Sequence, residues 1–163
     1  MAISTDEIIS TLNGLIETCK DGEKGFREAA EGSDDSRLRS LFEQYSQQRG
    51  EFARELQFEV TSLGGSPEKS GSISGAMHRG WINMKSAVTG KDRKAIVSEA
   101  ERGEDSAVKM YREALACGLP EDIASIVERQ YRRVLEAHDT VRSLELQAEA
   151  PERPMHGGGG VGY

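Results

Sequence analysis

The stretch AIVSEAERGEDSAVKMYREAL, residues 95–115, decides the fold. Its apolar residues recur every three or four positions, which is the spacing of one face of an α-helix. Carboxylates interrupt that face: Glu104 follows Ala100 by four residues and precedes Ala107 by three, and Glu101 lies on the same side. The pattern predicts an amphipathic helix that carries acidic side chains into the interior of a helical protein.

Three further stretches show the same helical spacing, so we predict an all-α protein. They cover about residues 5–31, 36–63 and 121–148. Ser4 or Thr5 is expected to cap the first helix, Gly32 to end it, and Pro120 to precede the last one. Four long amphipathic helices bury their apolar faces most simply in a bundle.

The connection over residues 64–90 determines the topology of that bundle. It opens with GGSPEKSGSISG and contains the only tryptophan, Trp81. It is far longer than a tight helix–helix turn of ~2–8 residues, so it can return along the bundle. We therefore predict a ferritin-like four-helix bundle with a long crossover, which contains a short helix held in place by Trp81. The alternative is an up-down-up-down bundle with an inserted surface loop.

Composition limits the domain organisation and the partners. One domain is expected over residues 1–149, followed by a flexible Gly-rich tail over residues 150–163. The net charge of −7 argues against nucleic acid as a partner, and no apolar run reaches the ~20 residues that span a membrane. The N-terminus lacks a signal peptide, so we expect a cytoplasmic protein. Cys19 and Cys117 fit apolar stripes and are expected to be buried thiols without a disulfide.

Four polar side chains interrupt the apolar stripes and are expected to meet at one depth inside the bundle. They are Glu23, Glu101, Glu104 and His138. Buried carboxylates are costly unless they are paired, hydrogen-bonded or bound to a cation. Two interpretations follow. The residues could form a polar layer that pairs with Arg49, Arg102 or Tyr45 and fixes the helix register, or they could be a metal site for iron or another divalent ion.

Three runs of sequence resemble a known family. They are LGGSPEKSGSISGAMHRGWINMK (residues 63–85), EAERGEDSAVKMYREAL (residues 99–115) and LPEDI…QY…AHDTVRSL in the last helix. They are similar to a bacterial family of four-helix-bundle proteins that is catalogued as a domain of unknown function within the ferritin-like group. The similarity extends over about residues 5–147, and HRGW and ERGED are its more specific parts. It implies a ferritin-like fold and no established activity.

Proteins of the wider ferritin-like group often bind two irons. The ligands are a Glu on each of two helices and a Glu-x-x-His on each of the other two. Glu23 and either Glu101 or Glu104 match the single Glu positions. The Glu-x-x-His pairs are missing, because Leu135 stands three residues before His138 and the second helix has no histidine. The sequence thus departs from a standard di-iron centre.

Two functions stay open from the sequence. The first is a non-catalytic binding or assembly protein of the bacterial cytosol, which could form a homodimer or bind another protein. The second is a metal-binding carboxylate-bundle protein with a degenerate site that handles iron or oxidants, in which case it would be an iron-dependent oxidoreductase. No GxSxG motif or P-loop points to another class of enzyme.

Overall fold

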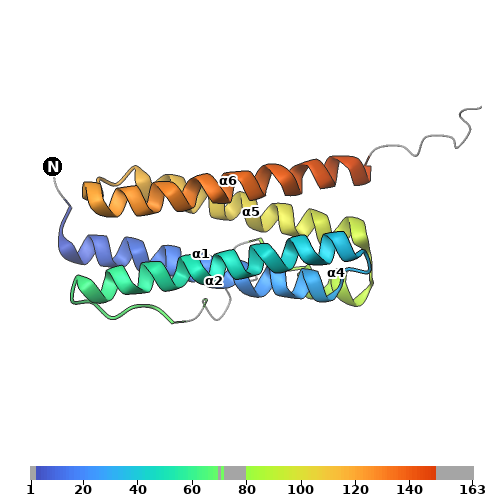
Figure 1. The fold of residues 1–163 in the computed structure, drawn as a ribbon, viewed down its shortest axis with the longest axis horizontal. Helices are drawn as coiled ribbons and strands as arrows, with labels where there is room; N and C mark the ends of the chain where they lie inside the picture. The colour runs from blue at the N-terminus through green and yellow to red at the C-terminus, as the bar shows by residue number, and fades with distance from the viewer. Residues whose placement is uncertain (1–2, 70, 72–79, 150–163) are drawn as a thin grey trace, which may run out of the picture.

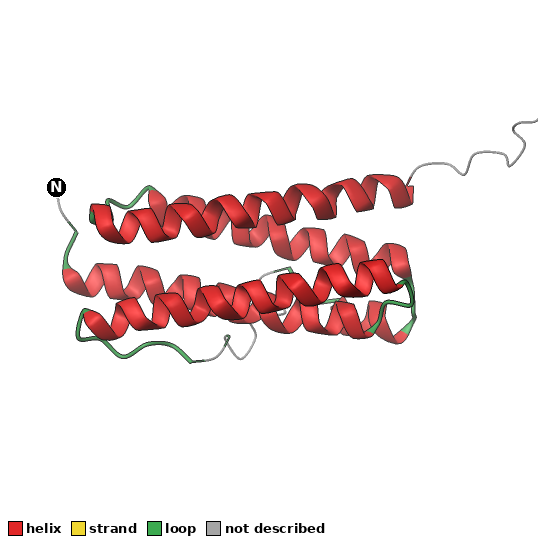
Figure 2. Cartoon of the chain, viewed as in Figure 1, coloured by secondary structure: helices red, strands yellow, loops and turns green. Residues whose placement is uncertain are grey.

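The computed structural model describes residues 3–69, 71 and 80–149 of the chain. Within these residues all the regular structure is helical (Figure 2). The helices are α1 (Thr5–Glu31), α2 (Ser36–Ser62), α4 (Met84–Thr89), α5 (Arg93–Leu115) and α6 (Glu121–Glu149). The predicted all-α class is therefore confirmed. The predicted flexible tail, residues 150–163, and His78 of the HRGW run lie outside the described residues.

The topology is that of a bundle with one crossover (Figure 1). Helix α1 is antiparallel to α2, and α5 is antiparallel to α6. The chain leaves α2 at one end of the bundle and enters α5 at the other end, so α2 and α5 run parallel. This is the ferritin-like arrangement, and the up-down-up-down alternative is wrong.

Local sequence explains where the helices begin. The Ser4 hydroxyl accepts a hydrogen bond from the Glu7 amide, and the Glu7 carboxylate accepts one from the Ser4 amide, so the two residues form a capping box. Asp35 and Asp92 cap α2 and α5 more simply, because each carboxylate accepts one hydrogen bond from a backbone amide of the first turn. These caps satisfy amide groups that the first helical turn leaves without partners.

Trp81 holds the end of the crossover on the bundle, as predicted. Its side chain is buried, and its ring meets the Phe26 ring edge-on with centroids 5.0 Å apart. The indole lies over Gly25 of α1 and Gly103 of α5, where an added Cβ would overlap the ring. Helix α4 then packs against α1 and α5. Small residues on two long helices thus make the space that the crossover needs.

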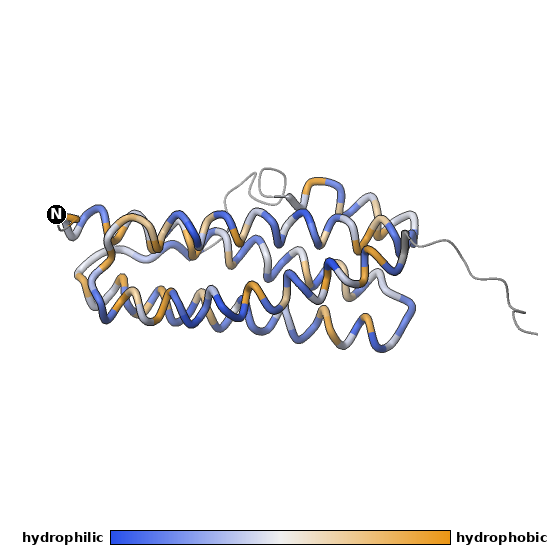
Figure 3. Tube along the Cα trace, turned by 90° about the horizontal axis from the view of Figure 1, so that it is seen from above, coloured by the Kyte–Doolittle hydropathy of each residue, from blue (hydrophilic) through white to orange (hydrophobic). Residues whose placement is uncertain are grey.

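Apolar residues alternate with polar ones along each long helix, and the buried ones form two clusters (Figure 3). The first cluster includes Leu12, Leu56, Tyr111 and Val127. The second surrounds Trp81. Because Arg49 and Glu104 fall between the two clusters along their helices, a polar layer divides the core. Within the described residues no helix is long and apolar enough to cross a membrane.

Candidate functional site

A buried ion pair occupies the polar layer of the bundle. Arg49 of α2 donates from Nη1 and Nη2 to the two carboxylate oxygens of Glu104 of α5, each over 2.6 Å. The exposed fractions of the two side chains are 1% and 0%. A bidentate pair of this kind satisfies both Glu104 oxygens. The prediction that Glu104 faces the interior is confirmed.

The surroundings of Arg49 explain how the bundle accommodates a guanidinium. Gly22 of α1 lies beside the Arg49 side chain, and the Phe26 ring lies 5.3 Å from the guanidinium carbon. Gln48 accepts a further hydrogen bond from Nε over 3.3 Å. Burial alone would lower the pKa of Arg49, but the Glu104 carboxylate outweighs burial and raises it. The guanidinium therefore stays charged inside the protein.

A chain of hydrogen bonds next to this pair links all four long helices. The Cys19 thiol lies 3.1 Å from the Tyr111 hydroxyl, which donates to Gln130 over 2.7 Å. Gln130 donates to Glu55 over 2.8 Å, and Glu55 also binds Arg129 at the surface. Burial is the main cause that raises the pKa of Cys19 to about 11, and it also raises the pKa of Tyr111. Both groups are thus held in their protonated, hydrogen-bonding forms.

A second cluster of polar side chains lies at the seam between α5 and α6. Glu101 and Asp105 stand one helical turn apart on α5, and His138 faces them from α6. One donor atom from each of the three side chains lies within 4.8 Å of the other two. His138 Nε2 is 2.6 Å from an Asp105 oxygen, and Nδ1 is 3.3 Å from an Asp139 oxygen.

Neighbouring charges act on the titration of this second cluster. Burial raises the pKa of Glu101, and a hydrogen bond with Glu145 and the charge of Asp105 raise it further, whereas Arg142 opposes them. Burial would lower the pKa of His138, but its hydrogen bonds with Asp105 and Asp139 raise it overall. The surplus of carboxylates therefore makes this seam attractive to a cation.

The structure does not bring all four predicted site residues to one place. Glu101 and His138 meet at the α5–α6 seam, whereas Glu104 is engaged by Arg49 in the interior. Glu23 forms an ion pair with Lys20 on its own helix over 3.0 Å, and its carboxylate lies over Gly50 of α2. His138 is only partly buried, so it is a residue of the seam and not of the core.

Sequence reasoning named Arg49 as one possible partner of the interior carboxylates, and the structure pairs it with Glu104, but neither Arg49 nor Gln130 was assigned to a buried stripe. Each continues a regular helical stripe in which small residues alternate with large ones. On α2 the stripe is Leu38, Phe42, Ser46, Arg49, Ala53, Leu56 and Val60, and on α6 it is Ile123, Val127, Gln130, Val134, Ala137 and Val141. Weighting small residues equally with large apolar ones would have placed both residues inside. Asp105 was missed because it belongs to no apolar stripe.

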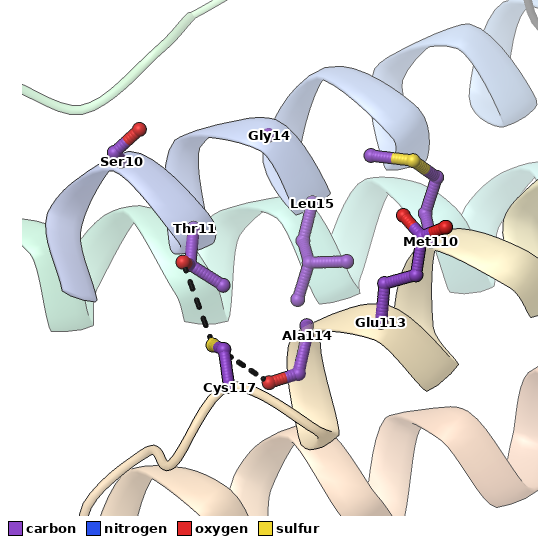
Figure 4. Close-up of a pocket in the computed structure, with 8 residues that line it drawn as sticks. All are labelled: Ser10, Thr11, Gly14, Leu15, Met110, Glu113, Ala114 and Cys117. Carbon is purple, nitrogen blue, oxygen red and sulfur yellow. Dashed lines mark hydrogen bonds between the residues drawn. The ribbon is translucent and has the colours of Figure 1, made fainter. Parts of the chain in front are cut away.

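A hollow between α1 and α5 contains the second cysteine (Figure 4). It has a volume of about 220 Å³, and Thr11, Leu15, Met110 and Cys117 are among the residues that line it. The Cys117 thiol donates to the Ala114 carbonyl over 3.0 Å. Cys19 is buried, as predicted, but the prediction for Cys117 is wrong, because it follows the last turn of α5 and is only half-buried. Neither thiol forms a disulfide.

Comparison with solved structures finds a similar fold in proteins of known structure. One of them is a two-domain protein from Anabaena variabilis that contains a DJ-1/ThiJ/PfpI-like and a ferritin-like domain. The TM-score is 0.74 at 18% sequence identity, and the match covers 94% of this chain and 43% of that one. This chain therefore spans less than half the length of the two-domain protein. The likeness and the crossover topology together show a ferritin-like fold.

Sequence comparisons place the chain in a family. No curated protein matches it. One family model matches residues 7–117, which include α2, α4, α5 and all of α1 except its first two residues. The chain therefore belongs to the family described as "Domain of unknown function (DUF2383)".

Proposed function

We propose that this protein is a non-catalytic member of the ferritin-like fold that acts by binding at its surface. The observation that carries the proposal is the Arg49–Glu104 ion pair in the bundle interior. In a di-iron bundle, carboxylates from the four helices converge on cations at the centre. Here the cation is a side chain of the protein itself.

Electrostatics supports this interpretation over an interior metal site. Two unit charges 4 Å apart interact by about 4 kcal/mol at the effective dielectric constant typical of proteins. A divalent ion beside Glu104 would meet roughly twice that repulsion from the Arg49 guanidinium. Both Glu104 oxygens are also already hydrogen-bonded. The interior charges are therefore balanced as they stand, without a metal ion.

The alternative, an iron-dependent oxidoreductase of the ferritin-like type, has weaker support. It would use a degenerate site with Glu23, Glu101, Glu104 and His138, and only Glu101 and His138 come together. Assembly through an apolar strip also has weak support. The large exposed apolar side chains among the described residues are Phe58, Ile82 and Leu146, and they lie on three separate segments. Binding of a ligand at a polar surface fits the structure better.

Aerobic oxidation of Fe²⁺, followed by absorbance, tests the proposal. We expect the wild-type protein to oxidise iron no faster than buffer does, and Glu104→Gln to behave in the same way. An active ferritin measured alongside shows that the assay works, and circular dichroism verifies that the variant is folded. Oxidation well above the buffer rate that Glu104→Gln abolishes would overturn the proposal. Light scattering on the same samples gives the mass in solution and so tests for a homodimer.

A further inference from the structure

We propose that Glu101, Asp105 and His138 bind one divalent transition-metal ion at the seam between α5 and α6. This site lies outside the bundle interior and uses no residue of α1 or α2. It goes beyond the proposed function, because an inert interior neither requires nor excludes it.

The geometry of the three side chains fits a shared ion. Metal–oxygen and metal–nitrogen bonds to zinc are about 2.0–2.2 Å long, so two ligands of one ion lie up to about 4.4 Å apart. The donor atoms of Glu101, Asp105 and His138 already lie within 4.8 Å of one another. Small side-chain rotations would therefore bring them to bonding distance, and the remaining positions around the ion would be open to water.

The hydrogen bonds of His138 also suit a metal ligand. Its Nε2 shares a proton with the Asp105 carboxylate over 2.6 Å, on the side where Glu101 lies, and a bound metal ion would take the place of that proton. Its Nδ1 faces the Asp139 carboxylate over 3.3 Å, so Asp139 would hold the one proton left on the neutral, metal-bound ring. A carboxylate behind a histidine is the usual support of a metal-binding imidazole, because it fixes the tautomer and the ring orientation.

The seam holds these ligands in place and carries unbalanced negative charge. The Glu101 and His138 side chains are only 12% and 17% exposed, so both are positioned by packing. Asp105, Asp139 and Glu145 add carboxylates around them. Arg142, which reaches Glu101 over 3.2 Å, is the cation that faces them from α6. Arg142 therefore competes with a metal ion for Glu101.

The donor set indicates the class of ion. One imidazole with two carboxylates suits zinc, cobalt and similar first-row divalent ions. Magnesium and calcium prefer sites made of oxygen atoms alone. We therefore expect Zn²⁺ to bind and Mg²⁺ to compete poorly.

Calorimetric titration with Zn²⁺ tests the site. The other two histidines, His78 and His156, are replaced by Gln in every sample, so that His138 is the only imidazole left. We expect one ion per chain, with affinity lowered at least tenfold by His138→Gln, Glu101→Gln or Asp105→Asn. Glu113→Gln, which removes an equal charge from α5 beside the hollow of Figure 4, should leave the affinity unchanged.

Arg142→Gln distinguishes a built site from general attraction between charges. It frees Glu101, so Zn²⁺ affinity should rise, and Arg132→Gln, which removes an exposed arginine elsewhere on α6, should change it little. The Co²⁺ spectrum should lack thiolate absorption, which shows that Cys117 is not a ligand. The proposal is overturned if no ion binds, if binding survives His138→Gln, or if Mg²⁺ competes as well as Zn²⁺. None of these results bears on the Fe²⁺ assay, so the two proposals fail separately.

Discussion

At the scale of single residues, the two cysteines should differ in reactivity. Burial raises the pKa of Cys19 to about 11, so only about one thiol in a thousand is ionised at pH 8, and the Tyr111 hydroxyl covers the sulfur. Cys117 is half-buried at the hollow between α1 and α5. We expect a thiol-specific chromogenic reagent at pH 8 to modify one cysteine of the folded protein rapidly, and Cys19 at least tenfold more slowly. Cys117→Ser should abolish the fast phase, and a fast phase that persists in this variant would contradict the assignment.

At the scale of elements, the crossover depends on glycines that make space for Trp81. Replacing Gly103 with Ala places a Cβ against the indole, and such overpacking costs about 1–3 kcal/mol of unfolding free energy. Trp81→Ala should cost about 3–5 kcal/mol, because it leaves a cavity next to Phe26. In the Trp81→Ala background, Gly103→Ala should be neutral or stabilising, since the Cβ then enters vacant space. Urea unfolding gives the free energy of unfolding of Gly103→Ala, of Trp81→Ala and of the variant that carries both changes.

Gly14→Ala is the matched control for this cycle, because a Cβ there meets only the Met110 methyl group at 4.0 Å. Alanine favours a helix over glycine by up to about 1 kcal/mol, so this variant should be stabilised. If the changes in unfolding free energy caused by Gly103→Ala and Trp81→Ala simply add in the double variant, the indole of Trp81 does not lie over Gly103. The contact between Trp81 and α5 would then be misassigned.

The same elements show what the sequence could predict. Stripes of apolar residues and the long connection before Trp81 were sufficient for the helices and the topology, since burial and chain length dictate both. Glu104 could be placed inside because it interrupts a stripe. Asp105 could not be assigned to His138. Successive residues of a helix point about 100° apart, and the rotation of α5 against α6 decides which of them meets the imidazole. That rotation depends on packing between helices, which spacing within one chain segment does not report.

At the scale of the whole molecule, the Arg49–Glu104 layer separates two apolar clusters that could otherwise be continuous. Breaking a buried pair leaves an uncompensated charge and costs about 3–5 kcal/mol, whereas replacing both partners with apolar residues is often neutral or stabilising by about 1–4 kcal/mol. We therefore expect Glu104→Met to destabilise the protein strongly and Arg49→Met combined with Glu104→Met to be at least as stable as wild type. Circular dichroism follows all helices during urea unfolding, while fluorescence follows Trp81 in one cluster. Coincident curves from both signals would show that the two clusters unfold as one unit with and without the ion pair. A double variant as unstable as Glu104→Met alone would mean that the pair itself, and not merely the neutralisation of Arg49, holds α2 against α5.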